Sequence, residues 1–268
     1  MCLLMFSLVS CIAIPSISHR KDYADMLSIQ HHWVGKQIVT ENFVLQTYVP
    51  RLLKITDTVT VYIEGDGLAW INTSTPSSNP TPTSPLALKL ALRDDSPSAY
   101  IARPCQYIEL NQSPLCEQKF WTSDRFSPEV IRSTNQAIDE IKRQFSAKKI
   151  ILVGYSGGGA VAALVAARRL DIIRLITIAG NLDHRTWTQL HHSSPLTNSL
   201  NPVDDIDSLK NIPQTHFVGG KDMIVSENVA RAYVSKFPID SKPSIVVMPE
   251  FDHACCWESS WPQLKRIN

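Results

Sequence analysis

The stretch VGYSGGGAVAALVAARRL, residues 153–170, decides the fold of this chain of 268 residues. Three glycines stand directly before an alanine-rich run, although glycine lowers helix propensity by about 1 kcal/mol relative to alanine. Residues 154–158 read G-x-S-x-G, and they lie between an apolar strand-like run, 149–153, and an apolar helical run, 160–170. This context predicts a sharp strand-to-helix turn with the hydroxyl of Ser156 projecting from it.

The glycines around Ser156 have a physical reason. A Cβ in so tight a turn would meet neighbouring backbone, so glycine is needed there despite its cost to the helix. The amides at the start of the following helix also remain free to stabilise a developing oxyanion. A phosphate-binding loop is the alternative, but the sequence lacks G-x-x-x-x-G-K-[ST]. We therefore predict that Ser156 is a nucleophile.

Apolar runs rich in β-branched residues alternate with helical patterns on both sides of this turn. Near-continuous apolar strands are typical of parallel strands that are covered on both faces. The chain is therefore predicted to be an α/β protein with a mostly parallel central sheet and helices on both faces. Strands are expected within 38–49, 59–67, 98–104, 148–156, 172–181, 215–222 and 244–253, and helices at 86–92, 127–145, 160–170 and 226–237.

The Ser/Thr/Pro-rich segment 71–85 is expected to be an extended surface loop. It is not expected to be an interdomain linker, because no core-sized segment precedes it. We predict an export leader and flexible arm over 1–19 and a single domain over 20–268.

The N-terminal residues MCLLMFSLVSCIAIPS, 1–16, begin with a short apolar segment typical of a signal peptide core. Residues 8–11, LVSC, resemble the lipobox of bacterial lipoproteins, which implies lipidation of Cys11 and attachment to a membrane. An ordinary secretory signal and a hydrophobic arm are the alternatives. The leader predicts an exported protein, located in the periplasm or cell envelope, or secreted.

Composition excludes some classes of partner. The formal net charge is +1 with no basic block, so a protein that follows nucleic-acid phosphates is not expected. In an exported chain, Cys105 and Cys116 are expected to form a disulfide, with buried free thiols as the alternative. No C-x-x-C spacing exists, so no zinc site is expected. The adjacent Cys255 and Cys256 allow no such assignment.

From about Val59 to the C-terminus the chain resembles the α/β-hydrolase superfamily, whose catalytic residues follow the order serine, acid, histidine. The resemblance implies that Asp222 in FVGGKDMIV is the acid and His253 in MPEFDHACCW the base, each just after a strand. The competing acids either do not directly follow a strand-like run or adjoin the histidine itself; they are Asp183, Asp204, Asp205, Asp207 and Asp252. The rival histidines are His184, His191, His192 and His216.

The segment VYIEGDG, 61–67, occupies the place of the family's oxyanion loop. The resemblance implies that the backbone N–H groups of Asp66 and Gly157 form the oxyanion hole. Carboxylates beside a developing oxyanion would oppose it, so those of Glu64 and Asp66 are expected to point away, bonded to loop amides or to Arg103.

The expected activity is that of a serine hydrolase on small carboxylic esters or thioesters, through an acyl-enzyme on Ser156 and without metal or organic cofactor. Two alternatives stay open: a serine peptidase of the same fold, and a non-catalytic envelope protein that binds a partner on a hydrolase scaffold.

Overall fold

A computed structural model describes residues 14–113 and 115–267. Its strands are β1 (Trp33–Val39), β2 (Val44–Pro50), β3 (Thr58–Ile63), β4 (Ser98–Ile101), β5 (Lys149–Tyr155), β6 (Ile172–Ile178), β7 (Gln214–Gly219) and β8 (Ser244–Met248). Its α-helices are α1 (Ile17–Gln30), α2 (Leu86–Leu92), α3 (Pro128–Phe145), α4 (Gly157–Ala166), α5 (His184–Leu190), α6 (Ile206–Leu209), α7 (Glu227–Val234) and α8 (Trp257–Leu264).

The eight strands form one sheet in the order β1-β2-β4-β3-β5-β6-β7-β8. Strands β1 and β2 pair antiparallel, and β2 also pairs antiparallel with β4. Every other neighbouring pair is parallel, from β4–β3 to β7–β8. The mostly parallel sheet that the sequence predicts is therefore confirmed.

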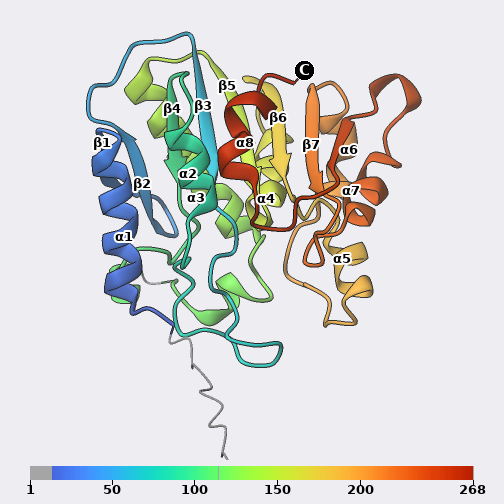
Figure 1. Cartoon of the computed structure of the whole chain (residues 1–268), viewed down its shortest axis with the longest axis horizontal. Helices are drawn as coiled ribbons and strands as arrows, with labels where there is room; N and C mark the ends of the chain where they lie inside the picture. Colours follow the sequence, from blue (N-terminus) through green and yellow to red (C-terminus); the bar gives the residue numbers. More distant parts are fainter. Residues whose placement is uncertain (1–13, 114, 268) are drawn as a thin grey trace, which may run out of the picture.

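Two apolar layers cover the sheet, because successive strand residues point to opposite faces. On one face Tyr62 and Tyr100 pack with the helices α1, α2 and α8. On the other face Val61, Ile63 and Ile101 pack with α3, α4 and α7. Figure 1 shows α8 crossing in front of the middle of the sheet and α1 beside its β1 edge.

The early strand expected within 38–49 is present as β2, and the end of a second strand, β1, falls in the same span. The segment 33–50 is a hairpin of β1 and β2, and the chain reverses between Thr40 and Phe43. The Thr40 N–H donates to the Phe43 carbonyl at 2.9 Å, and the Phe43 N–H donates to Thr40 Oγ1 at 3.2 Å. Threonine closes this turn with its own side chain, a local signal that apolar periodicity does not report.

The prediction of a surface loop at 71–85 is correct only for its first half. From Ser77 the segment is mostly buried, and its polar groups are hydrogen-bonded inside the protein. The Trp121 indole donates to the Ser77 carbonyl at 3.0 Å, and the Tyr107 N–H donates to Thr81 Oγ1 at 2.8 Å. A polar, proline-rich segment can be buried here because other parts of the chain satisfy its backbone.

Helix α1 is not predicted by the sequence, because its buried side has no apolar stripe and consists of Arg20, Ala24 and Ser28. It begins at Ile17, so residues 17–19 of the predicted arm form its first turn. The predicted lipidation site Cys11 lies outside the described residues. Within the described part of the chain, no helix has the length and apolar character needed to cross a membrane.

Candidate active site

Ser156 lies in the turn between β5 and α4, as the glycine pattern predicts. Its backbone has φ +52° and ψ −122°, a conformation that non-glycine residues rarely adopt. A Cβ at Gly158 would overlap the carbonyl oxygens of Ile63 and Glu64, so only glycine lets α4 begin this close to the end of β3. The close approach of α4 to the end of β3 therefore holds this turn in place.

The structure brings the three residues of the predicted triad together. His253 Nε2 lies 3.0 Å from Ser156 Oγ, and His253 Nδ1 lies 2.8 Å from Asp222 Oδ2. The other oxygen of Asp222 accepts the N–H groups of residues 224 and 225, at 2.8 Å each. With Nδ1–H donating to the carboxylate, Nε2 is left to accept the serine proton.

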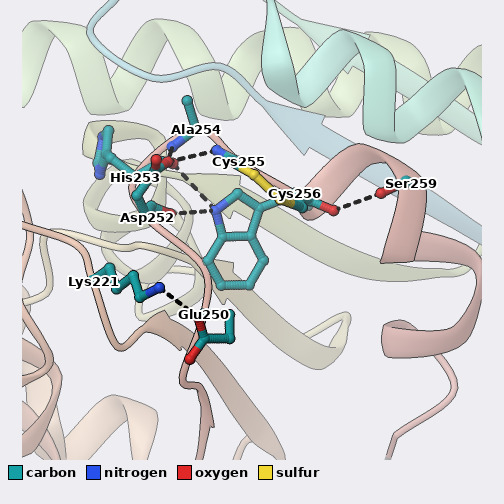
Figure 2. The surroundings of a disulfide bond; sticks show 9 residues. Lys221, Glu250, Asp252, His253, Ala254, Cys255, Cys256 and Ser259 are labelled. Atoms are coloured by element: carbon teal, nitrogen blue, oxygen red, sulfur yellow. Dashed lines mark hydrogen bonds and ion pairs between the residues drawn. A yellow bond between two sulfur atoms is a disulfide. The ribbon is translucent and has the colours of Figure 1, made fainter.

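The loop between β8 and α8 holds His253 in place (Figure 2). The carbonyl of His253 accepts the hydroxyl of Tyr155 and the indole N–H of Trp257, both at 3.2 Å. The neighbouring Asp252 accepts the N–H groups of residues 254 and 255 at 2.8 and 2.7 Å, so its carboxylate caps its own turn and does not orient the imidazole.

Figure 2 also shows a disulfide between the adjacent residues Cys255 and Cys256, which the sequence does not predict. Both cysteines are exposed, two and three residues after His253. The loop begins at the ion pair between Lys221 and Glu250, which joins it to the end of β7.

Two backbone amides are available beside Ser156. Neither the N–H of Gly157 nor that of Asp66 donates a hydrogen bond within residues 14–113 and 115–267. Gly157 is the first residue of α4, where the helix leaves amides without internal partners. The carboxylate of Asp66 lies against Gly157, since a Cβ at Gly157 would overlap Asp66 Oδ1.

Two buried arginines hold the Asp66 carboxylate. Arg103 Nη1 donates to Oδ1 at 2.9 Å, and Arg125 Nη1 donates to Oδ2 at 2.7 Å. Burial alone would raise the pKa of Asp66, but the attraction and hydrogen bonds of Arg125 and Arg103 outweigh it and hold the pKa below its usual value. The carboxylate therefore stays charged, with its charge directed at the guanidinium groups.

Glu64 is buried and points into the protein interior. Its Oε1 accepts the N–H groups of Gly65 at 2.9 Å and Ala87 at 3.3 Å, and its Oε2 accepts the Tyr100 hydroxyl at 3.2 Å. Glu64 thus satisfies an amide at the start of α2. Burial raises its pKa to about 7, although these hydrogen bonds act in the opposite direction.

A disulfide joins Cys105 to Cys116 with a Cα–Cα distance of 5.5 Å. Cys105 lies between two residues that support the oxyanion loop, Arg103 and Gln106. Gln106 Nε2 donates to the carbonyl of Gly65 at 3.0 Å. The predicted disulfide is present, and it tethers the segment on which the oxyanion loop rests.

The triad opens into a cavity of about 380 Å³. Its lining includes Ser156 and His253 together with Trp70, Trp187 and Ile224. The cavity is thus large enough for a small organic ligand.

The sequence did not single out three residues of this site, Tyr155, Arg125 and Asn181. Tyr155 has a signal, because it is the variable residue of the G-x-S-x-G turn. Arg125 and Asn181 have none, since one precedes α3 and the other follows β6 at no characteristic spacing.

The rival histidines do not join the triad. His216 is buried in β7 against Thr177 Oγ1 at 2.8 Å, and burial lowers its pKa to about 3. The side chain of His191 faces the carbonyl of Ile224 at 2.8 Å. Over residues 14–113 and 115–267, no three His, Cys, Asp or Glu side chains are grouped to hold a metal ion.

The solved structures that the fold is similar to include α/β serine hydrolases. The chain is similar to the Pyrococcus furiosus esterase Pf2001, with 13% identity, a TM-score of 0.61, and coverage of 95% of this chain and 93% of that one. It is similar to Est1E from Butyrivibrio proteoclasticus, with 14% identity, a TM-score of 0.57, and coverage of 84% and 93%.

A third similar structure is the Pyrococcus horikoshii acylaminoacyl peptidase, with 11% identity, a TM-score of 0.56, and coverage of 82% of this chain but 37% of that one. No family model matches the chain, and no curated protein matches its sequence. At these identities the likeness establishes the α/β-hydrolase fold.

Proposed function

We propose that the protein is a serine hydrolase that cleaves carboxylic esters through an acyl-enzyme on Ser156. The observation that carries this proposal is the continuous relay from Ser156 Oγ through His253 to Asp222, with two unbonded amides beside the serine. Free amides beside a serine lower the barrier to acyl transfer, because they stabilise the oxyanion that forms.

In the first half of the reaction, Ser156 Oγ attacks the ester carbonyl carbon while His253 Nε2 takes the hydroxyl proton. The carbonyl oxygen becomes an oxyanion and accepts the N–H groups of Gly157 and Asp66. His253 then delivers its proton to the leaving alkoxide, and the carbon–oxygen bond of the ester breaks. Asp222 stabilises the imidazolium while it exists.

In the second half, a water molecule takes the place of the alcohol. His253 accepts a proton from the water, whose oxygen attacks the acyl carbon. The bond to Ser156 Oγ breaks, the serine regains its proton, and the acid leaves. The net reaction consumes one ester and one water and yields one acid and one alcohol.

A thioester would react by the same steps, and so would a peptide with a suitable leaving amine. The likeness to an acylaminoacyl peptidase keeps the peptidase alternative open. A binding protein on this scaffold remains the non-catalytic alternative, and it would have no need of the relay.

Labelling with a fluorophosphonate separates an enzyme from a binding scaffold. The probe should modify Ser156, and Ser156→Ala should abolish labelling. A panel of matched acyl esters, thioesters and peptides should show turnover of the esters. Absence of labelling in the folded protein would refute the proposal, and turnover of peptides alone would replace it with the peptidase.

Mutant kinetics test whether the three residues act as one unit. Ser156→Ala and His253→Ala should each lower turnover on the order of 10⁶-fold, and the double variant little further. Asp222→Asn should cost on the order of 10⁴-fold, because it favours the wrong imidazole tautomer. Asp252→Asn is the matched control and should retain activity. If Asp252→Asn lost activity and Asp222→Asn retained it, the catalytic acid would be Asp252 and not Asp222.

We also propose that the protein is exported, by a cleaved leader or by a leader lipidated at Cys11. The Cys105–Cys116 disulfide supports this location, because disulfides persist in oxidising compartments. Mass spectrometry of the mature N-terminus tests it: a start at Cys11 with a lipid mass identifies a lipoprotein, and an unprocessed Met1 refutes both forms of export.

A further inference from the structure

The disulfide between Cys255 and Cys256 is open to solvent and lies next to the catalytic base (Figure 2). Both cysteines are exposed, and they follow His253 by two and three residues. The other disulfide is less accessible, because Cys105 is 0% exposed and Cys116 is only half-buried at its partner end. Exposed disulfides are the labile ones, since a thiolate has to reach a sulfur atom to exchange with it. None of the acyl-transfer steps uses the exposed pair.

The surroundings of this pair favour a thiolate. Cys256 is the N-cap residue of α8, and the N-terminus of a helix stabilises a thiolate. The two cysteines line a cavity of about 450 Å³ together with Lys89, Arg93 and the acid Glu258. Glu258 lies 3.3 Å from Arg93 and 3.9 Å from Lys89, so its one negative charge faces two positive ones. Cleavage of the disulfide, which releases a thiolate, is therefore favoured at this place.

This second cavity adjoins the catalytic one, because Ser84 and Tyr155 line both of them. Tyr155 also contacts the catalytic base. Its hydroxyl donates to the carbonyl of His253 at 3.2 Å, and the two ring centroids lie 5.2 Å apart. A change at the cysteines therefore occurs at a wall that the catalytic cavity shares, as well as within the loop that carries His253.

The disulfide restricts this loop between two anchors. At its start, Asp252 Oδ1 accepts two N–H groups of the loop, at 2.8 and 2.7 Å. At its end, the indole of the buried Trp257 donates to the carbonyls of Asp252 and His253, at 3.0 and 3.2 Å. Between these anchors, the bond from Cys255 to Cys256 closes a small ring that includes the backbone, so both residues lose conformational freedom. Reduction opens the ring and restores that freedom.

We propose that Cys255 and Cys256 form a thiol–disulfide exchange site, at which reduction by a dithiol lowers the hydrolytic activity. This inference rests on the proposed function. A thiolate of the dithiol attacks one sulfur, the Cys255–Cys256 bond breaks, and a mixed disulfide forms while the other cysteine leaves as a thiolate. The second thiol of the reductant then attacks the mixed disulfide. Two electrons and two protons pass to the protein, which holds two thiols, and the dithiol becomes a disulfide.

Reduction should act on kcat. Proton transfer requires His253 Nε2 within hydrogen-bond reach of Ser156 Oγ, and these atoms are 3.0 Å apart in the disulfide form. A misplacement of about 1 Å can cost on the order of 100-fold in rate. Because the anchors at Asp252 and Trp257 survive reduction, we expect a smaller loss, on the order of 10-fold. The cysteines do not line the catalytic cavity, so KM should change little.

The test treats the full-length protein, first oxidised with oxidised glutathione, with increasing concentrations of dithiothreitol. Free thiols are alkylated and located by mass spectrometry of peptides. Cys255 and Cys256 should react at a dithiothreitol concentration about tenfold or more below the one that opens Cys105–Cys116. After removal of the reductant, which itself cleaves activated esters, kcat for p-nitrophenyl acetate should be lower on the order of 10-fold. Renewed oxidation should restore it.

Two double variants locate the effect. Cys255→Ser with Cys256→Ser should have the lowered kcat without reductant and should not respond to dithiothreitol. Cys105→Ser with Cys116→Ser is the matched control, since it removes the other disulfide and should keep the response. Thermal melts establish that each variant is folded. If the control does not fold, the wild-type protein reduced only at the exposed pair gives the same comparison.

The outcomes separate this inference from the proposed function. Free thiols at Cys255 and Cys256 after oxidation would overturn the inference, and so would full reduction of the pair with unchanged kcat. An equal response to dithiothreitol in the variant that lacks both cysteines would also overturn it. In each case the oxidised protein still hydrolyses esters, so the proposed function stands. Absence of turnover and of fluorophosphonate labelling in both redox forms would overturn both.

Discussion

Asp66 stands between two buried guanidinium groups, and its replacement by asparagine separates its structural role from its chemical one. The side chains of Arg103 and Arg125 are 5% and 7% exposed, and that of Asp66 is 17% exposed. Removing the charge of one member of such a cluster leaves the others buried without compensation, at a cost of about 3–5 kcal/mol. Because asparagine still accepts one hydrogen bond, we expect Asp66→Asn to lose about 3 kcal/mol of unfolding free energy.

The assay is thermal and denaturant unfolding at pH 7, together with ester turnover. For a chain of this length, about 3 kcal/mol corresponds to a fall in Tm of roughly 6–12 °C. Turnover of the folded variant should stay close to that of wild type, because the Asp66 N–H survives the substitution. Asp204→Asn is the matched control: its partner Arg185 is exposed, and such pairs contribute only about 0–1 kcal/mol.

The pH dependence of the stability difference between wild type and Asp66→Asn gives a further check. The pKa of Asp66 is depressed in the folded protein, so its stabilising effect is present above the unfolded value of about 3.9 and lost as pH falls through the folded value. The difference in unfolding free energy between wild type and Asp66→Asn should be constant from pH 6 to 8 and should disappear in acid. Equal stability at pH 7 would refute the bridging role, and turnover as low as that of Ser156→Ala would show that the carboxylate takes part in the chemistry.

Three further predictions follow from single contacts. Removal of the Cys105–Cys116 disulfide by a double alanine substitution should cost about 3 kcal/mol in unfolding experiments, and free thiols in non-reduced peptides of the exported protein would contradict the pairing. Because its pKa is raised, Glu64 stabilises the fold at low pH, and this stabilisation is lost as the pH rises from about 4.5 to 7. Glu64→Gln should therefore flatten the decline of unfolding free energy over that range. An unchanged pH profile in denaturant melts would show that Glu64 does not titrate there. Gly158→Ala should destabilise the fold by about 3 kcal/mol, since its Cβ meets the carbonyl oxygens of Ile63 and Glu64, and a normal Tm would mean that this turn can relax.

Local sequence patterns predicted much of the fold of this protein. The parallel strands and most helices between them follow from apolar runs and period, because each strand or helix buries its own side chains over a few consecutive residues. The position of Ser156 was predicted from the glycine pattern, and those of Asp222 and His253 from the resemblance to the α/β-hydrolase superfamily. Each follows a parallel strand, and the carboxyl ends of such strands meet at one edge of the sheet.

Segments without an apolar pattern were predicted poorly. Helix α1 turns polar residues toward the core, and the hairpin β1–β2 is divided by a turn that a threonine closes with its own hydroxyl. The second half of 71–85 looks like a surface loop by composition. It is buried because hydrogen-bond partners arrive from residues such as Trp121, 44 positions away in sequence.

The sequence by itself determined the fold class and the elbow, because each depends on residues within short segments and the strands beside them. The order of the candidate triad was what the resemblance to the α/β-hydrolase superfamily implied. Only the tertiary structure decided that Asp66 joins two arginines, one of them 59 residues away. It also decided that Lys89 and Arg93 line one cavity with the Cys255–Cys256 pair. Such pairings depend on where several strands end relative to one another. The sequence around a charged residue is the same whether that residue binds water, a distant side chain or a substrate.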